Sequence, residues 1–265
     1  MRYFNYFKRF CRIPAVFFLI FLFVFSGTAG GFIFSFRKRK KIQFYTQNTS
    51  FFSRLIIKAL NIKIRTVPYF FIPHELEQKK FFIISNHLSY LDIPVISSFF
   101  HSLFISSIEI KKTFFLGKIA KTGGSVFVER RSLKTIQSDI EKISKLLNSG
   151  FNTVLFPEGT TSNGEKVLPF KKSLFETAGD QTEILPICIQ YIEINKEKIN
   201  DKNKNLVYWY GKMPFFRHFL NLMLKTDEIL LELRLLPVLK VEREGFDRKN
   251  ICEKIYETIS RSYLN

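Results

Sequence analysis

A histidine and an aspartate, His87 and Asp92, stand five residues apart directly after the apolar run at residues 81–85. On a continuous helix they would point about 140° apart and could not meet. A strand, a tight turn over residues 86–89 and a helix from near Tyr90 would bring them together. The carboxylate would then fix the imidazole tautomer and leave the second ring nitrogen free to take a proton from a hydroxyl. The pair predicts a general base that requires no serine or cysteine nucleophile.

Two further segments place polar side chains where strands are expected to end. "GGSVFVERR" ends at Arg130 and Arg131, and "LFPEGTTSNG" carries Glu158 in a turn rich in glycine and hydroxyl residues. In open α/β sheets, ligands bind outside the carboxyl ends of the strands. We therefore expect His87, Arg130 and Glu158 to converge on one crevice.

The expected chemistry of this crevice is anion binding. Arg130 can hold a phosphate through two hydrogen bonds. Hydroxyls and backbone N–H groups around Gly159, Thr160, Thr161 and Ser162 can surround the phosphate oxygens. The pattern predicts an anionic substrate.

The elements that must position these residues alternate between strands and helices. The clearest helix begins near Ser132, repeats apolar residues on one face and ends at Gly150. This alternation predicts an α/β domain without internal repeats, running from residue 48 to residue 265, with a polar loop at residues 195–205. Strands are predicted at residues 81–85, 103–108, 125–129, 152–156, 184–191, 206–211 and 229–236.

The segment at residues 13–36 carries no charge. As a helix rising about 1.5 Å per residue it would reach roughly 36 Å, enough to span a bilayer. Three interpretations are open: a spanning helix, a signal peptide cut near Ala29, and a re-entrant hairpin that bends at the "SGTAGG" run, residues 26–31. The basic cluster at residues 37–41 favours retention. We assign residues 1–47 to a membrane anchor with basic flanks.

Composition limits the partners. The formal charge of +18, from 41 Lys+Arg against 23 Asp+Glu, indicates either anionic lipid headgroups or nucleic acid. A membrane-tethered nucleic-acid-binding protein is disfavoured, because the basic residues are scattered without a recognisable binding module. Three widely separated cysteines, Cys11, Cys188 and Cys252, predict neither a disulfide framework nor a metal site.

The order of these segments resembles the glycerolipid acyltransferase family, specifically the 1-acylglycerol-3-phosphate acyltransferases, whose four motifs all occur here in order. "NHLSYLD" is similar to the first motif, which implies that His87 is the general base and Asp92 its orienting partner. "GGSVFVER", "FPEGTTS" and "ILPICI" resemble the other three, and "PFKKSLFETA" fits the basic and aromatic stretch between the last two. The resemblance assigns substrate binding to Asn86, Gly124, Phe127, Arg130, Glu158, Gly159, Thr160, Thr161, Lys171 and Pro186.

The resemblance also implies a fold and a reaction. The expected fold is a mixed central sheet flanked by helices, with an N-terminal membrane-binding helix or helical hairpin. The expected reaction moves an acyl chain from acyl-CoA or acyl carrier protein to the free hydroxyl of 1-acylglycerol-3-phosphate, giving phosphatidic acid. No cofactor or metal is expected.

Other acceptors and the cellular location follow from the same resemblance. A different lysolipid, such as a lyso-ornithine lipid, is the alternative acceptor. The expected partners are the two substrates, an anionic membrane surface and acyl carrier protein, without nucleic acid. The expected location is the cytoplasmic (inner) membrane, with the catalytic domain facing the cytoplasm.

Overall fold

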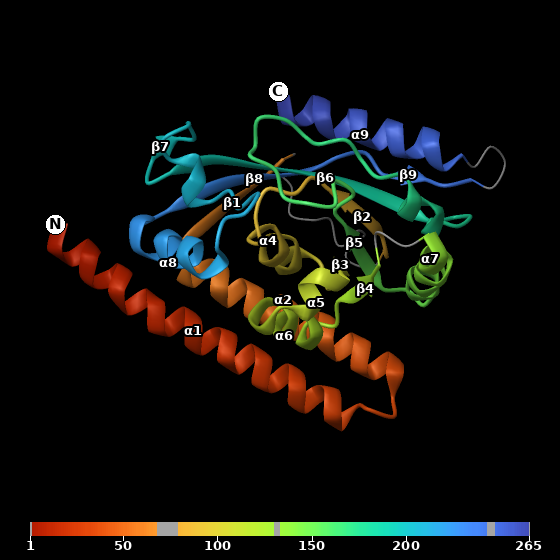
Figure 1. The fold of residues 1–265 in the computed structure, drawn as a ribbon, viewed down its shortest axis with the longest axis horizontal. Coiled ribbons are helices and arrows are strands. Elements are labelled where there is room, and N and C mark those ends of the chain that lie inside the picture. Colours follow the sequence, from red (N-terminus) through yellow and green to blue (C-terminus); the bar gives the residue numbers. More distant parts are fainter. Residues whose placement is uncertain (1, 68–78, 130–132, 243–246, 265) are drawn as a thin grey trace.

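The central element of the fold is one mixed β-sheet. The structure is a computed structural model and describes residues 2–67, 79–129, 133–242 and 247–264. Across these ranges the strand order is β1-β8-β6-β2-β5-β3-β4, with β7 and β9 also pairing with β6 (Figure 1). The strands are β1 (Ile62–Val67), β2 (Phe82–Ser85), β3 (Ser102–Ser107), β4 (Val126–Val128), β5 (Asn152–Leu155), β6 (Glu183–Ile194), β7 (Glu197–Lys198), β8 (Ile229–Leu235) and β9 (Leu239–Lys240).

The centre of the sheet is parallel. β2 pairs in parallel with β5 and β6, β3 pairs in parallel with β5 and β4, and β8 runs antiparallel to β6. Every residue of β2 and β5 is buried, as expected for parallel strands covered on both faces. The predicted mixed α/β fold is confirmed. The carboxyl ends of β2, β5, β3 and β4 lie at one edge, where the site residues were expected to meet.

Helices cover both faces of the sheet. In Figure 1, α9 lies over one face, while α1, α2, α4, α5, α6 and α8 lie on the other and α7 packs beside β4. α7 confirms the helix predicted between Ser132 and Gly150. The helices are α1 (Arg2–Ile33), α2 (Lys38–Ala59), α4 (Asp92–Phe99), α5 (Ile108–Lys112), α6 (Phe114–Thr122), α7 (Leu133–Asn148), α8 (Phe215–Lys225) and α9 (Arg248–Leu264), with 3-10 turns η1 (Ser173–Thr177) and η2 (Lys204–Leu206).

The strand predicted at residues 206–211 is wrong. η2 ends at Leu206 and the chain then turns without joining the sheet. The aromatic residues that suggested a strand instead cover the site: Tyr208 is buried, and the Trp209 N–H donates to the Leu88 carbonyl at 3.0 Å. The loop predicted at residues 195–205 contains the short strand β7 and most of η2.

α1 and α2 form an antiparallel hairpin (Figure 1). The turn that joins them lies between residues 33 and 38, after the glycine run at residues 26–31. One of the three open interpretations, the re-entrant hairpin, placed its bend at residues 26–31, but α1 continues through them. The glycines serve close packing instead: a Cβ on Gly27 would lie 2.8 Å from the Thr122 carbonyl oxygen of α6, and one on Gly30 would lie 2.0 Å from the Phe44 ring of α2. The boundary drawn between residues 47 and 48 falls inside α2.

Two basic residues of the N-terminal flank hold α1 against the body. Arg9 Nε donates to Asp227 Oδ1 at 2.6 Å, and Arg12 Nη1 donates to the Thr226 carbonyl at 2.7 Å. Within the described part of the chain, one helical segment, Arg9–Ile33, is long and apolar enough to cross a membrane, with a mean hydropathy of 2.3. Its phenylalanines are largely exposed, among them Phe10, Phe18, Phe21, Phe25 and Phe32.

Candidate active site

The turn between β2 and α4 brings His87 and Asp92 together. His87 Nδ1 lies 2.8 Å from Asp92 Oδ2, which also accepts the backbone N–H groups of Leu88 at 2.7 Å and Ser89 at 2.9 Å. The other oxygen, Oδ1, accepts the Tyr191 hydroxyl at 2.9 Å. Because a carboxylate accepts from Nδ1–H, the Nε2 of a neutral His87 carries the free lone pair. The predicted turn and pairing are confirmed.

The loop that carries His87 is held by its backbone. The His87 N–H donates to Glu158 Oε1 at 2.6 Å, and the His87 carbonyl accepts the Ser162 N–H at 2.9 Å. With the Trp209 N–H bonded to the Leu88 carbonyl, two distant segments, residues 158–162 and residue 209, fix this turn. The imidazole is therefore oriented before any substrate arrives.

Asn86 joins the same loop to the sheet. Its amide nitrogen donates to the Ile189 carbonyl at 2.9 Å, and its amide oxygen accepts the Ile189 N–H at 2.8 Å. Asn86 is buried, and Pro186 is buried in β6, paired with Ile84 of β2. The structure gives both residues contacts inside the sheet, so their part in substrate binding stays a prediction.

Glu158 lies behind the His87 loop. It is 3% exposed, and its second oxygen, Oε2, accepts the Leu168 N–H at 2.9 Å. Burial raises the pKa of Glu158 to about 8, against the opposing effect of the two backbone hydrogen bonds. Both oxygens are thus occupied by backbone donors, an arrangement that ties together the loops on either side of it. Its predicted contact with a phosphate stays a prediction.

A cavity of about 310 Å³ opens beside the imidazole. His87, Gly159, Thr160 and Thr161 are among the residues that line it, and the His87 ring stacks on Phe156 with centroids 4.0 Å apart. Apolar residues of α6 and α4, Leu116, Ile119 and Ile93, also line it. The structure thus brings three predicted binding residues to the candidate base.

A second cavity, of about 160 Å³, adjoins the first. Tyr90, Ile93, Leu116 and Phe23 line both, so the two share a wall. The smaller cavity lies among α1, α2, α4, α6 and α8 and is almost wholly apolar. Together the cavities offer a polar end at His87 and an apolar end between the helices.

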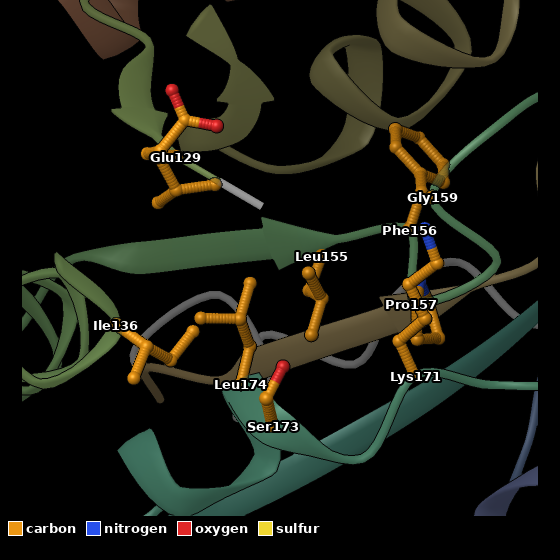
Figure 2. A pocket seen from close by; sticks show the side chains of 10 residues that line it. Glu129, Ile136, Leu155, Phe156, Pro157, Gly159, Lys171, Ser173 and Leu174 are labelled. Atoms are coloured by element: carbon orange, nitrogen blue, oxygen red, sulfur yellow. The ribbon is translucent and has the colours of Figure 1, made fainter. Parts of the chain in front are cut away.

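Lys171 lies on the other side of the Gly159 turn, in a small hollow of about 30 Å³ (Figure 2). Its Nζ is 2.7 Å from the point that a Cβ on Gly159 would occupy, so the ammonium lies directly against that glycine. Figure 2 shows Glu129 on the far side of the hollow, at the end of β4. The predicted anion-binding residue Arg130, like Arg131, lies outside the described residues.

Gly124 and Phe127 lie near α2 and α5 and do not line the cavities described above. Gly124 has a φ of +74°, and a Cβ there would meet the Tyr45 ring at 2.9 Å, which explains the glycine by backbone conformation and packing. The Lys111 ammonium lies 5.5 Å from the centre of the Phe127 ring. Within the described ranges, no group of three or more His, Cys, Asp or Glu side chains is arranged to hold a metal ion.

Sequence reasoning missed Tyr191 as a site residue. It closes the "ILPICIQY" strand, and its hydroxyl contacts an aspartate 99 positions earlier in the chain. It also missed Tyr90, whose hydroxyl lies 2.9 Å from His218 Nδ1. No local pattern marks either contact, because each joins segments that only the tertiary fold makes neighbours.

Comparison with known proteins finds one family and several relatives. A family model described as "Acyltransferase" matches residues 66–190. The lyso-ornithine lipid O-acyltransferase of Brucella abortus is 32% identical over 194 residues, covering 70% of each chain. A 1-acyl-sn-glycerol-3-phosphate acyltransferase of Neisseria gonorrhoeae is 37% identical over 112 residues, covering 42% of this chain and 44% of that protein.

A further relative and a solved structure extend these matches. The lyso-ornithine lipid O-acyltransferase of Rhizobium meliloti is 31% identical over 158 residues, and the match spans about half of that protein, 54%. The crystal structure of the 1-acyl-sn-glycerophosphate (LPA) acyltransferase PlsC from Thermotoga maritima superposes with a TM-score of 0.63. That comparison covers 100% of this chain and 98% of the other at 19% identity, so it shows a shared fold.

Proposed function

Because the chain belongs to the acyltransferase family, we propose that it transfers a fatty acyl chain from an acyl thioester to the free hydroxyl of 1-acylglycerol-3-phosphate, giving phosphatidic acid. The observation that carries the proposal is the hydrogen-bonded pair of His87 and Asp92 beside a cavity lined by both polar and apolar residues. Such a cavity suits an amphipathic substrate pair.

In the proposed mechanism, His87 Nε2 takes the proton of the acceptor hydroxyl as the oxygen attacks the thioester carbonyl. The carbon–sulfur bond breaks, and the imidazolium returns the proton to the leaving thiolate. Asp92 stays ionised and stabilises the imidazolium. A general base contributes roughly 10² to 10⁴-fold, so alignment of the two substrates must supply much of the remaining acceleration.

The donor's acyl chain is proposed to lie along the apolar residues of the cavity. Ile93, Leu116 and Ile119 are apolar residues that line both this cavity and the smaller one between the helices. Either acyl-CoA or acyl carrier protein can present such a chain, because both carry it as a thioester. No cofactor is required in this scheme.

The acceptor's phosphate is proposed to bind at the Gly159 turn. Lys171 supplies a cation against Gly159 from the neighbouring hollow, and Thr160 and Thr161 line the cavity beside His87 from the same turn. Arg130 is the second cation expected from the sequence. Lys171→Gln should raise the KM for 1-acylglycerol-3-phosphate, whereas Lys172→Gln, which removes a surface ion pair with Glu253, should not.

A lyso-ornithine lipid is the second candidate acceptor. The observation that favours it is the match to the Brucella protein, which covers 70% of both chains. Its headgroup carries no phosphate, so Lys171→Gln should affect it less than it affects the phosphate-bearing acceptor. The same base and the same attack on a thioester serve both acceptors.

We further propose that the enzyme works at the cytoplasmic membrane, with the catalytic domain facing the cytoplasm. The exposed phenylalanines of α1 offer an apolar surface, and the basic cluster at residues 37–41 follows directly. Arg9 and Arg12 contribute less to lipid binding than their charge suggests, since they bond to residues 226 and 227.

The test is acyl transfer by purified protein in detergent. Wild-type and His87→Ala proteins are given a radiolabelled acyl donor, first acyl-CoA and then acyl carrier protein, with a panel of lysolipids that includes 1-acylglycerol-3-phosphate and lyso-ornithine lipid. Transfer to the first by wild type alone supports the proposal, and transfer only to the second moves the assignment to that acceptor. Absence of transfer to every acceptor with both donors would refute it. Vesicle flotation of both proteins checks that His87→Ala still folds and binds membrane.

A further inference from the structure

One hydrogen bond to the candidate aspartate comes from outside its own loop. Three donors to Asp92 lie within residues 87–89 and all reach Oδ2. Oδ1 has a single donor among the described residues, the Tyr191 hydroxyl at 2.9 Å. Tyr191 belongs to β6, on the strand that pairs with β2. The carboxylate is therefore held from two separate parts of the sheet.

Burial makes this fourth bond important. Asp92 is fully buried and Tyr191 is 2% exposed. A buried carboxylate oxygen without a partner is costly and favours uptake of a proton by the carboxyl group. A protonated Asp92 could no longer stabilise an imidazolium at His87. The hydroxyl thus lies where it can stabilise the ionised form of the group behind the base.

The tyrosine itself has little freedom to move. Its ring packs edge-on against Tyr208, with centroids 5.7 Å apart, and its backbone pairs with Leu231 of β8. Tyr208 is fixed in turn, since its carbonyl accepts from His218 Nε2 at 3.0 Å. Burial and the nearby Asp92 raise the pKa of Tyr191, so it stays a hydrogen-bond donor.

We propose that Tyr191 is a positioning residue for the acyl transfer: its hydroxyl holds Asp92 as the ionised partner of His87 and directs Oδ2 at Nδ1. This inference rests on the proposed function for its kinetic test. It adds a third member, acting through Asp92, to the pair recognised from the sequence. Tyr191 does not line the cavity beside His87 and acts on the reaction only through the aspartate.

The kinetic experiment compares Tyr191→Phe with wild type and with Tyr256→Phe, which removes a half-buried hydroxyl that donates to the Val167 carbonyl. Tyr191→Phe should lower kcat by roughly 10- to 100-fold, as expected for loss of one hydrogen bond to a charged group, with KM little changed. The acidic limb of its pH–rate profile should move to higher pH, because the ionised Asp92 carboxylate has lost a donor that stabilises it. Tyr256→Phe should keep the wild-type profile.

Two further measurements keep the inference testable. Labelled histidine followed by NMR reports the titration of His87 without any substrate, among only four histidines in the chain. That titration should change in Tyr191→Phe even if the acceptor or donor is misassigned. If Tyr191→Phe does not fold, 3-fluorotyrosine at position 191 keeps the ring and the hydroxyl but donates more strongly, and should move the acidic limb to lower pH.

Defined results would overturn the inference. An unchanged kcat and an unchanged acidic limb in folded Tyr191→Phe would do so. So would a loss of kcat without any shift of the limb or of the His87 titration, since that pattern marks a purely structural role. If wild type acylates no lysolipid, the proposed function fails, and the NMR titration alone decides the role of Tyr191.

Discussion

Replacing Glu158 by glutamine should change how stability depends on pH. Burial raises the pKa of Glu158 to about 8 from an ordinary value of 4.5. Between those values the folded protein binds one proton more than the unfolded chain, so the free energy of unfolding falls as pH rises. The stabilisation that Glu158 adds to the folded protein is fully present below about pH 4.5 and is lost as the pH rises to about 8.

The size of the effect follows from the linkage relation. When the folded protein binds one proton more than the unfolded chain, the free energy of unfolding falls by roughly 1 to 2 kcal/mol per pH unit. Glutamine carries no charge, and it keeps only one oxygen to accept from the N–H groups of His87 and Leu168. The lost hydrogen bond lowers the free energy of unfolding by about 1–3 kcal/mol at every pH. Glu158→Gln should therefore be less stable than wild type near pH 5 and should approach or pass it near pH 8.

Urea unfolding in detergent at several pH values between 5 and 8.5 measures this difference. Glu165→Gln is the matched control, because its carboxylate lies in the same loop but is 68% exposed, and its difference from wild type should stay flat. A constant difference between wild type and Glu158→Gln across the range would refute the reasoning. It would mean that Glu158 remains ionised in the folded protein despite its burial.

Two further substitutions test how α1 is held. Gly27→Ala should destabilise the protein by about 1–2 kcal/mol in thermal or urea unfolding, because the contact with the Thr122 carbonyl outweighs the gain in helix propensity. Gly179→Ala, where a Cβ meets nothing within 4 Å, is its control, and equal stability of the two variants would contradict the packing argument. Asp227→Asn should speed hydrogen exchange at the start of α1, because it weakens the ion pair with Arg9 at a cost of about 1 kcal/mol or less. Unchanged exchange there would show that packing alone docks the helix.

The parts of the fold that sequence predicted correctly are those with a local signal. The buried apolar runs of β2 and β5 and the amphipathic period of α7 predicted their own elements. The spacing of His87 and Asp92 required a turn, and the structure has one. Where a local pattern fits two structures, it did not settle the outcome. The aromatic residues at 206–211 suit a strand but cover the site without forming one. The glycine run at residues 26–31 suits a bend but allows close helix packing within α1.

The sequence by itself determined the α/β class, the pairing of His87 with Asp92 and the apolar N-terminal helix, because each depends on the backbone period or on residues a few positions apart. Tertiary structure alone decided the partners of the site. Asn86 meets Ile189 across 103 positions, Tyr191 meets Asp92 across 99, and Glu158 meets the His87 N–H across 71. These contacts depend on which strands become neighbours in the sheet. A hydrogen bond between such distant segments leaves no periodic trace in the chain, so only the fold could assign Glu158 and Tyr191 their places around the base.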